Sequence, residues 1–355
     1  MTIDDRFRHS DQWLDREGPE HHVVVSSRAR YARNLPRIPF PMRASADELR
    51  AVVEQVQEAV DMVPLFRNGL QFNLTGIGRI ERNYLKENHL ISTEMEKGGE
   101  SRVIFVSSDV KLAVMVNEED HLRMFALEGG FQPFEALNAV VALEDQLSRK
   151  LHFAFSPRYG YLTACPTNTG TGLRASVMLH LPALAMLKQV PDLVKRMPQQ
   201  GLTVRGFYGE NSDNMGDFFQ VSNEVTLGVS EQEIVQRLHL VVEDLVRREE
   251  GARRHLFERQ REAVEDEVWR AYGLLTHARI ITSQEAVALL SKLRFGIDRG
   301  YFGNLTHSAL NHLIIDVQPG HLQVAGGGGE VNVHRRDVMR AEMLRRRLQQ
   351  PPTQN

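Results

Sequence analysis

The stretch Thr163-Ala164-Cys165-Pro166-Thr167-Asn168-Thr169-Gly170-Thr171-Gly172-Leu173-Arg174-Ala175-Ser176 holds the only cysteine of the chain, one proline, two glycines and several small hydroxyl residues. An apolar periodicity that begins at about Arg174 predicts a helix directly after this loop. A glycine-rich loop that leads into a helix N-terminus favours phosphate binding, because free N–H groups and the helix dipole both attract anions. No lysine of a Walker loop follows the glycines, and Arg174 would take its place on the first turn. The alternative interpretation is a tight turn around a buried cysteine.

The composition is that of an ordinary globular protein. Of the 355 residues, 25% are charged and 42% are hydrophobic, and the formal net charge is -3. This length favours two domains, which we place at residues 1–250 and 251–355, where the composition shifts to a charged helical pattern. The small net charge argues against direct nucleic-acid binding. A single cysteine, no apolar leader segment and no membrane-length apolar run predict a cytoplasmic protein without membrane contact.

Two further segments combine a predicted strand with charged residues. Residues 22–26 predict a buried strand that leads into Ser26-Ser27-Arg28-Ala29-Arg30, where two arginines at a spacing of two point to the same side. Either anions hold this pair or the strand is a solvated edge. Residues 112–116 predict a strand that leads into Asn117-Glu118-Glu119-Asp120-His121-Leu122-Arg123. Three consecutive acids are costly to bury without partners, so they indicate a solvated turn or a general base with the polar residues that position it.

A fourth segment also combines a predicted strand with charged residues. Residues 201–212 predict a strand, an arginine, a glycine-bounded loop and a carboxylate, within Arg205-Gly206-Phe207-Tyr208-Gly209-Glu210. The chain thus places five arginines near strand ends or glycine-rich loops, with Glu119 and Glu210 as accompanying acids: Arg28, Arg30, Arg123, Arg174 and Arg205. This excess of fixed cations favours a polyphosphate ligand.

These four segments, in this order, resemble the catalytic domain of the ATP:guanidino phosphotransferases, such as the creatine and arginine kinases. The resemblance extends to about residue 250. It implies an α+β fold in which helices flank an antiparallel sheet, followed here by an α-helical C-terminal domain. The chain lacks most of the separate N-terminal helical domain of the metabolite kinases and adds a C-terminal extension, which is similar to the bacterial protein-arginine kinases of this family. An acceptor side that is left open suits an arginine on a protein surface.

The resemblance implies roles for individual residues. Glu119 matches the catalytic base, Glu210 the carboxylate that orients the guanidinium group, and Cys165 the reactive cysteine beside that group. Mg²⁺ would bridge the phosphates of ATP, and no side chain is expected to bind a metal. The implied ATP site consists of Ser26, Ser27, Arg28, Ala29, Arg30, His89, Arg123, Arg174, Ala175, Ser176, Val177, Met178, Arg205, Gly206, Phe207, Tyr208 and Gly209.

The C-terminal extension contains Arg336-Asp337-Val338-Met339-Arg340-Ala341. Arg336, Asp337 and Arg340 share one side of a predicted helix, where a solvated intrahelical Asp–Arg pair is the plain interpretation. The segment is also similar to the phosphoarginine-binding RDxxRA motif of the protein-arginine kinases, which implies an allosteric site made of Arg336, Asp337, Arg340 and Ala341. The resemblance further implies a homodimer, the activator McsA, the repressor CtsR as a substrate, and ClpC–ClpP as the protease that degrades marked proteins.

Three other functions compete with phosphorylation of arginine in proteins. A kinase for a free guanidino compound would use the same catalytic residues. A non-catalytic phosphoarginine-binding adaptor would have lost the base or the arginines, yet Glu119, Glu210, Cys165 and all five arginines are present. A DNA-binding regulator would need a basic face that the composition does not offer.

Overall fold

The computed structural model describes residue 14 and residues 17–206, 216–303 and 305–349. Its centre is an eight-stranded sheet in the order β2-β3-β4-β5-β1-β8-β10-β9, in which every neighbouring pair is antiparallel. The predicted α+β class with an antiparallel sheet is confirmed. The strands are β1 (Val24–Arg33), β2 (Leu70–Asn73), β3 (Val103–Val106), β4 (Leu112–Val116), β5 (Leu122–Gly129), β8 (Leu173–His180), β9 (Leu202–Arg205) and β10 (Phe218–Asn223), with β6 (Phe155–Ser156) and β7 (Gly160–Tyr161) as a separate two-stranded ribbon.

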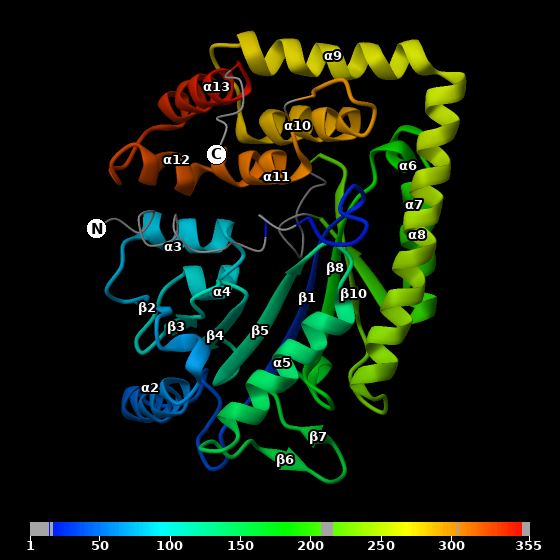
Figure 1. The fold of residues 1–355 in the computed structure, drawn as a ribbon. Coiled ribbons are helices and arrows are strands. Elements are labelled where there is room, and N and C mark those ends of the chain that lie inside the picture. Colours follow the sequence, from blue (N-terminus) through cyan, green and yellow to red (C-terminus); the bar gives the residue numbers. More distant parts are fainter. Residues whose placement is uncertain (1–13, 15–16, 207–215, 304, 350–355) are drawn as a thin grey trace.

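The helices fall into two groups. Figure 1 shows α5 and the long α8 beside the sheet, and α9 to α13 gathered beyond one end of the strands. The helices of the sheet region are α2 (Ala46–Asp61), α3 (Arg79–Glu87), α4 (Thr93–Glu96), α5 (Pro133–Leu147), α6 (Pro182–Met186), α7 (Val190–Arg196) and α8 (Glu231–Arg259), with 3₁₀ turns at Pro64–Phe66, Pro166–Asn168 and Met197–Gln200. The C-terminal group is α9 (Arg261–His277), α10 (Ser283–Ile297), α11 (His307–Asp316), α12 (Pro319–Ala325) and α13 (Val333–Gln349), which confirms a helical C-terminal region.

The central strand β1 divides its side chains between the two faces of the sheet. Ala29 and Tyr31 are buried in the main apolar core, where β1 packs against α5. Arg33 lies on this side as well and forms an ion pair with Glu144 of α5. Because successive residues of a strand alternate, Arg28 projects to the opposite face. Part of that face is closed by a second apolar cluster, in which residues of β2 to β5 pack under α3 and α4.

The prediction of a helix that begins at about Arg174 is wrong. Residues Leu173–His180 form β8, which pairs with β1 on one side and β10 on the other. The next helix, α6, starts only at Pro182, where proline fits because the first N–H of a helix has no internal partner. The loop before Arg174 therefore leads into a strand, and a helix dipole does not contribute to anion binding there. Attraction for a phosphate must come from side chains.

Other predicted boundaries agree with the structure. Ser45 caps α2 with a complete capping box, and Thr282 caps α10 by accepting a hydrogen bond from the N–H of Glu285. Helix α8 continues without a break through residue 250, so the division of the chain into two domains at this residue remains a prediction. Among the described helices, none is both long enough and apolar enough to cross a membrane.

Helix α12 is hydrogen-bonded to α3 through one buried carboxylate. Glu87, at the end of α3, accepts hydrogen bonds from the N–H groups of Gly320 (2.8 Å) and His321 (3.0 Å) and lies 2.8 Å from Nδ1 of His321. The imidazole of His321 also stacks on Tyr84, with ring centroids 4.1 Å apart. Since a buried charge is tolerated only with such partners, Glu87 fixes the C-terminal helices against the sheet region.

Replacing Glu87 with alanine is expected to lower the free energy of unfolding by about 3 kcal/mol, because two N–H groups and an imidazole lose their buried partner. The matched control is Glu54→Ala, which removes an exposed glutamate of α2 and should change stability by less than about 0.5 kcal/mol. Urea unfolding followed by circular dichroism measures both. Equal effects of the two substitutions would show that the Glu87 contacts contribute nothing.

Candidate active site

Arginines from separate segments of the chain lie on one face of the sheet. Arg30 of β1 is opposite Arg174 of β8, and Arg28 follows the same side of β1. Residues that oppose each other in a strand pair project to the same face. On the other edge of β1, Arg30 is opposite Phe125 of β5. Arg123 precedes Phe125 by two residues and therefore shares this face.

Arg205 reaches the same face through β10. It is opposite Gln220, and Gln220 is in turn opposite Met178 of β8. Met178 lies four residues after Arg174 in the same strand, and this even spacing places both side chains on one face of the sheet. The five arginines predicted to bind phosphates thus belong to β1, β5, β8 and β9 and share a single face of the sheet.

A cleft of about 390 Å³ lies over this face. We call it the arginine cleft. Four of the five arginines line the cleft: Arg28, Arg30, Arg174 and Arg205. The other lining residues include Ser176 of β8, Gln220 of β10, Lys86 of α3, His89 after α3, and Gln318 and Pro319 at the start of α12. The size and the polar lining suit a nucleotide rather than a simple ion.

The positively charged arginines of the cleft lie close enough to repel one another. Burial, and after it the charge of Arg123, lowers the pKa of Arg28 to about 10. Burial and the same neighbour also hold the pKa of Arg30 well below its usual range. The Nε atoms of Arg28 and Arg123 are buried and have no hydrogen-bond partner within the described residues. The negative charge of a polyanion in the cleft would relieve this repulsion.

The acidic turn between β4 and β5 separates two neighbouring glutamates. Asn117 turns the chain with a positive φ of 58° and donates from its side chain to the carbonyls of Leu49 and Ser101, 2.9 Å each. Glu118 is buried and accepts a hydrogen bond of 2.6 Å from Nη1 of Arg123. Glu119 lies 3.2 Å from Nη2 of Arg123 and keeps 36% of its side chain exposed. Both glutamates of the turn therefore contact Arg123, but only Glu118 is buried, and Glu119 remains partly exposed.

The environment of Glu119 favours its acting as a proton acceptor. Partial burial raises the pKa of Glu119 above the usual value, and this effect outweighs the opposing charge of Arg123. A carboxylate that is half shielded from water and adjacent to a cationic cleft can accept a proton from a bound cation. This supports the role predicted for Glu119.

Asp120 connects the acidic turn to the cysteine loop. Its Oδ1 atom accepts hydrogen bonds from the N–H of Ala164 and from Nδ2 of Asn34, each 2.7 Å long. Asn34 also donates to the carbonyl of Leu162, at 3.0 Å. Because Asp120 follows Glu119 and Ala164 precedes Cys165, these bonds bring the predicted base and the predicted cysteine to one place. Asn34 is a functional position that the sequence patterns did not predict, although a polar residue directly after an arginine-bearing strand is a signal for it.

Cys165 lies in the loop just before a single 3₁₀ turn. Its side chain is half-buried, and Sγ is 3.0 Å from Oγ1 of Thr167. The nearby glycines serve chain packing: at Gly172, which has a φ of 66°, an added Cβ would meet the carbonyl oxygen of Ala32 at 2.7 Å. Gly172 thus allows close approach to β1, and at Gly170 an added Cβ would clash with the carbonyl oxygen of Thr226. The interpretation that these glycines cradle phosphate is not needed.

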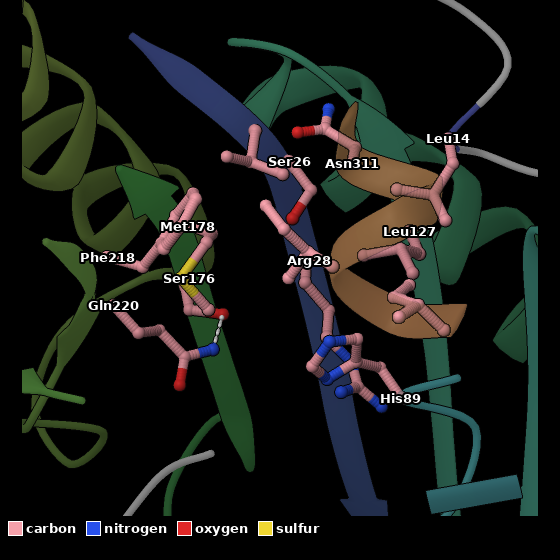
Figure 2. Close-up of a pocket in the computed structure, with 13 residues that line it drawn as sticks. Leu14, Ser26, Arg28, His89, Leu127, Ser176, Met178, Phe218, Gln220 and Asn311 are labelled. Carbon is pink, nitrogen blue, oxygen red and sulfur yellow. Dashed lines mark hydrogen bonds between the residues drawn. The ribbon is translucent and has the colours of Figure 1, made fainter. Parts of the chain in front are cut away.

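His89 lies between the arginine cleft and a narrower recess behind it, the inner slot, which is drawn in Figure 2. Its backbone has a positive φ of 60°, which is uncommon for a residue other than glycine. Burial and then the charge of Arg28 lower the pKa of His89 to about 4. The imidazole is therefore neutral at pH 7, so it can contact a nucleotide by stacking or hydrogen bonding without adding charge.

Several residues implied by the resemblance turn away from the cleft. The side chains of Ala29, Ala175 and Val177 belong to the main core on the opposite face, and Ser27 donates from Oγ to the carbonyl of Gly130 at 2.8 Å. Any contact of these residues with ATP would use the backbone. Gly206 follows β9 directly. Phe207, Tyr208, Gly209 and the second predicted carboxylate, Glu210, lie outside the described residues.

The predicted phosphoarginine residues lie on α13. Arg340 is 1% exposed and donates from Nε to the carbonyl of Val317 (2.7 Å) and from Nη1 to the carbonyl of Ile281 (2.8 Å). Asp337 accepts a bond of 2.5 Å from the same Nη1. Ala341 is fully buried. Arg336 lines a separate cleft between α3 and the start of α13. In this arrangement Arg340 and Asp337 hold α13 to the neighbouring helices.

Two family models match the chain. Residues 51–252 match the C-terminal catalytic domain of the ATP:guanido phosphotransferases, which is more than half of the chain. The chain belongs to the ATP:guanido phosphotransferase family. Residues 261–355 match the model of the protein-arginine kinase McsB C-terminal domain. As a member of this family the protein is an ATP-dependent phosphotransferase, which agrees with a nucleotide-sized cleft lined by arginines.

Relatives within the ATP:guanido phosphotransferases resemble the chain along nearly all of its length. The protein-arginine kinase of Symbiobacterium thermophilum is 42% identical over 344 residues, which cover 96% of this chain and 97% of the relative. The protein-arginine kinase of Geobacillus stearothermophilus is 42% identical over 339 residues, 95% of this chain and 93% of the relative. The one from Bacillus subtilis is 41% identical over 341 residues, 95% and 93% respectively.

Solved structures of ATP:guanido phosphotransferases resemble a smaller part of this chain. The duplicated taurocyamine kinase of Schistosoma mansoni, solved with bound transition state analog components, superimposes with a TM-score of 0.60 and 26% identity over 67% of this chain and 35% of its own. Lombricine kinase gives a TM-score of 0.56 and 26% identity over 67% of this chain and 70% of its own. These similarities confirm the fold predicted for the catalytic region.

Proposed function

We propose that the protein transfers the γ-phosphoryl group of Mg-ATP to arginine side chains of other proteins. The observation that carries this proposal is the hydrogen-bonded junction at Asp120, which brings Glu119 and the Cys165 loop together. Glu119 also lies within electrostatic reach of Arg30, which lines the arginine cleft. The relatives that match nearly the whole chain and are named protein-arginine kinase support a protein as the acceptor.

The chemistry follows from the weakness of the acceptor as a nucleophile. A guanidinium group has delocalised lone pairs and a pKa above about 12, so one nitrogen must lose a proton as it attacks phosphorus. Glu119 accepts this proton while the N–P bond forms and the bond from phosphorus to the bridging oxygen of ADP breaks. Cys165 and Glu210 would hold the remaining N–H groups, which fixes the attacking nitrogen in line with the leaving oxygen.

The arginines stabilise the charge that this transfer develops. In phosphoryl transfer the equatorial oxygens of the γ-phosphoryl group carry negative charge in a loose transition state. Arg30 and Arg174 oppose each other in the sheet and both line the cleft, and Arg174 is held in place by donating from Nη1 to the carbonyl of Asn223. Fixed donors of this kind act more strongly than water, because they are already oriented before the reaction.

Mg²⁺ would arrive with the nucleotide. Glu87 is the carboxylate that lines the described part of the arginine cleft, and its oxygens already accept hydrogen bonds from α12 and from Asn83. The donor set around the phosphates is therefore cationic, which suits a metal held by phosphate oxygens and water. When bound, the metal would neutralise phosphate charge.

The wider biological role is also part of this proposal. By analogy with the resemblance described above, phosphoarginine would mark proteins for ClpC–ClpP and inactivate the repressor CtsR, with McsA as an activator. The protein would act as a homodimer in the cytoplasm, and phosphoarginine bound near Arg336 would tune its activity. Since Arg340 is occupied by backbone carbonyls, such binding would require α13 to change its contacts.

A phosphotransfer assay with Mg-ATP tests the proposal. It compares free arginine with an arginine-rich unstructured protein as acceptors, and it examines whether the product has the acid lability expected of a P–N bond. Acid-labile label on the protein alone is the expected result. Label on free arginine instead would favour a metabolite kinase, and label on neither acceptor, also in the presence of a candidate activator, would favour a non-catalytic adaptor.

The activity should depend on the ionisation of Glu119. Because burial raises the pKa of Glu119, the base form is lost on acidification at a pH above the value of about 4.3 that an ordinary glutamate has. The acidic limb of kcat/KM, which reports groups of the free enzyme, is therefore expected above pH 4.3 and absent from Glu119→Gln. An unchanged acidic limb in that variant would assign the ionisation to another group.

A further inference from the structure

The inner slot behind His89 joins the sheet region to the C-terminal helices. One side is formed by Met178 and Phe218 of β8 and β10, and the other by Ile314 and Ile315 of α11. Figure 2 shows β1 along the floor, with Met178 and Gln220 on one side of it and Asn311 of α11 on the other. The slot is thus a narrow, largely apolar space between two parts of the chain that lie far apart in sequence.

The slot is continuous with the arginine cleft. Arg28, His89, Ser176, Met178 and Gln220 line both spaces. A nucleotide has a polyanionic part and a flat, largely apolar ring, and a site for it needs both environments within reach of each other. The arginine cleft provides the first environment, and the inner slot provides the second.

Buried hydrogen bonds hold α11 at a fixed place relative to β8. Arg294 of α10 donates from Nε to Oδ1 of Asn311 (3.2 Å), and its Nη1 is 2.8 Å from Nδ1 of His180. His180 is the last residue of β8 and stacks on Phe218, with ring centroids 4.7 Å apart. The same Nη1 donates to the carbonyl of His22 at 2.9 Å. The wall that α11 adds to the slot is therefore preorganised by side chains of both regions.

We infer that α11 forms one wall of the pocket for the base of the nucleotide, with Ile314 and Ile315 packed against the ring and Asn311 near its polar edge. This inference rests on the proposed function, because it takes ATP as the ligand of the arginine cleft. It extends that function by making the helical C-terminal region, which lies outside residues 51–252 of the catalytic-domain match, a direct part of nucleotide recognition.

The test compares two buried neighbours on α11. Ile314→Ala removes an apolar side chain that borders the slot, and Leu313→Ala removes one of similar size that belongs to the main core and does not border it. Calorimetry measures the Kd of ATP and of inorganic triphosphate, which has no base. Ile314→Ala is expected to raise the Kd of ATP roughly tenfold, from lost apolar contact with the ring, and to leave the Kd of triphosphate unchanged. Leu313→Ala should change neither.

The other outcomes overturn the inference. It fails if Ile314→Ala and Leu313→Ala have the same effect on ATP, or if Ile314→Ala weakens ATP and triphosphate equally. Ile314→Val and Leu313→Val give the same comparison with a smaller loss of volume in case the alanine variants do not fold. Failure of the premise that the arginine cleft binds ATP has a different signature, since the unmodified protein would then bind neither ligand, and Arg28→Ala would have no affinity to reduce. Failure of the proposed acceptor is detected separately, by label on free arginine in the phosphotransfer assay.

Discussion

Glu119→Gln is expected to lower kcat for phosphorylation of arginine by about 10³-fold, within the range that a positioned general base contributes. Glutamine keeps the size and the hydrogen-bonding oxygen of the side chain but cannot accept the proton that the guanidinium group loses. Glu119 lies 3.2 Å from Nη2 of Arg123 and remains partly exposed, so the substitution leaves the buried Glu118–Arg123 pair in place. The affinity for ATP should therefore not change.

Two other glutamates serve as controls. Glu94→Gln changes an exposed residue of α4 that pairs with Lys97, and it should preserve both kcat and ATP affinity. Glu118→Gln removes the buried partner of Arg123 and should weaken ATP binding as well as catalysis. Single-turnover kinetics and calorimetry separate the two parameters. Normal turnover by Glu119→Gln would exclude this residue as the base.

Arg30→Ala is expected to reduce kcat/KM by about 10⁴-fold, since an arginine that stabilises a transferring phosphoryl group contributes about 10³ to 10⁵. Arg30 is opposite Arg174 in the sheet and lines the cleft, so alanine removes a fixed cation from its centre. Arg30→Lys should recover only part of the loss, because lysine keeps the charge but not the planar fork that grips two oxygens.

The matched control is Arg43→Ala, which removes an exposed arginine away from the sheet and the same formal charge. Steady-state kinetics on an arginine-rich protein should give the parental kcat/KM for this variant. If Arg30→Ala and Arg43→Ala proved equally active, net charge rather than the arrangement of the cleft would govern the interaction with ATP.

The sequence predicted features that depend on local patterns. The spacing of Arg28 and Arg30 gave their common side, because a strand alternates with a period of two. The polar pattern at Ser45 gave the start of α2, because capping uses residues within four positions. The prediction of a helix that begins at about Arg174 is wrong, because residues Leu173–His180 form β8. Val177, Leu181 and Leu184 have a helical spacing, but this spacing runs across the end of β8 into α6. Within residues 173–180, Leu173, Ala175 and Val177 alternate with Arg174 and Ser176, and this period of two indicates a strand.

Other features have no local signature. The bond between Asp120 and the N–H of Ala164 joins two loops that only the folded sheet brings together, and the wall that α11 contributes to the inner slot depends on contacts of Arg294 with His180 and Asn311. Neither spacing nor composition reports such contacts. The two glutamates of the acidic turn are adjacent in sequence, and only the structure shows that Glu118 is buried while Glu119 is partly exposed.

The position of β1 at the centre of the sheet has a consequence for synthesis of the protein. Ser26 pairs with Gly129 on one edge and with Met178 on the other, so both partner strands leave the ribosome long after β1. Closing such long loops is entropically costly and slows folding. During this interval β1 has two open edges, which invite pairing with other chains. Arg28, Arg30 and Arg33 disfavour that pairing by charge repulsion, so two arginines that later line the cleft, Arg28 and Arg30, also protect the nascent chain from aggregation.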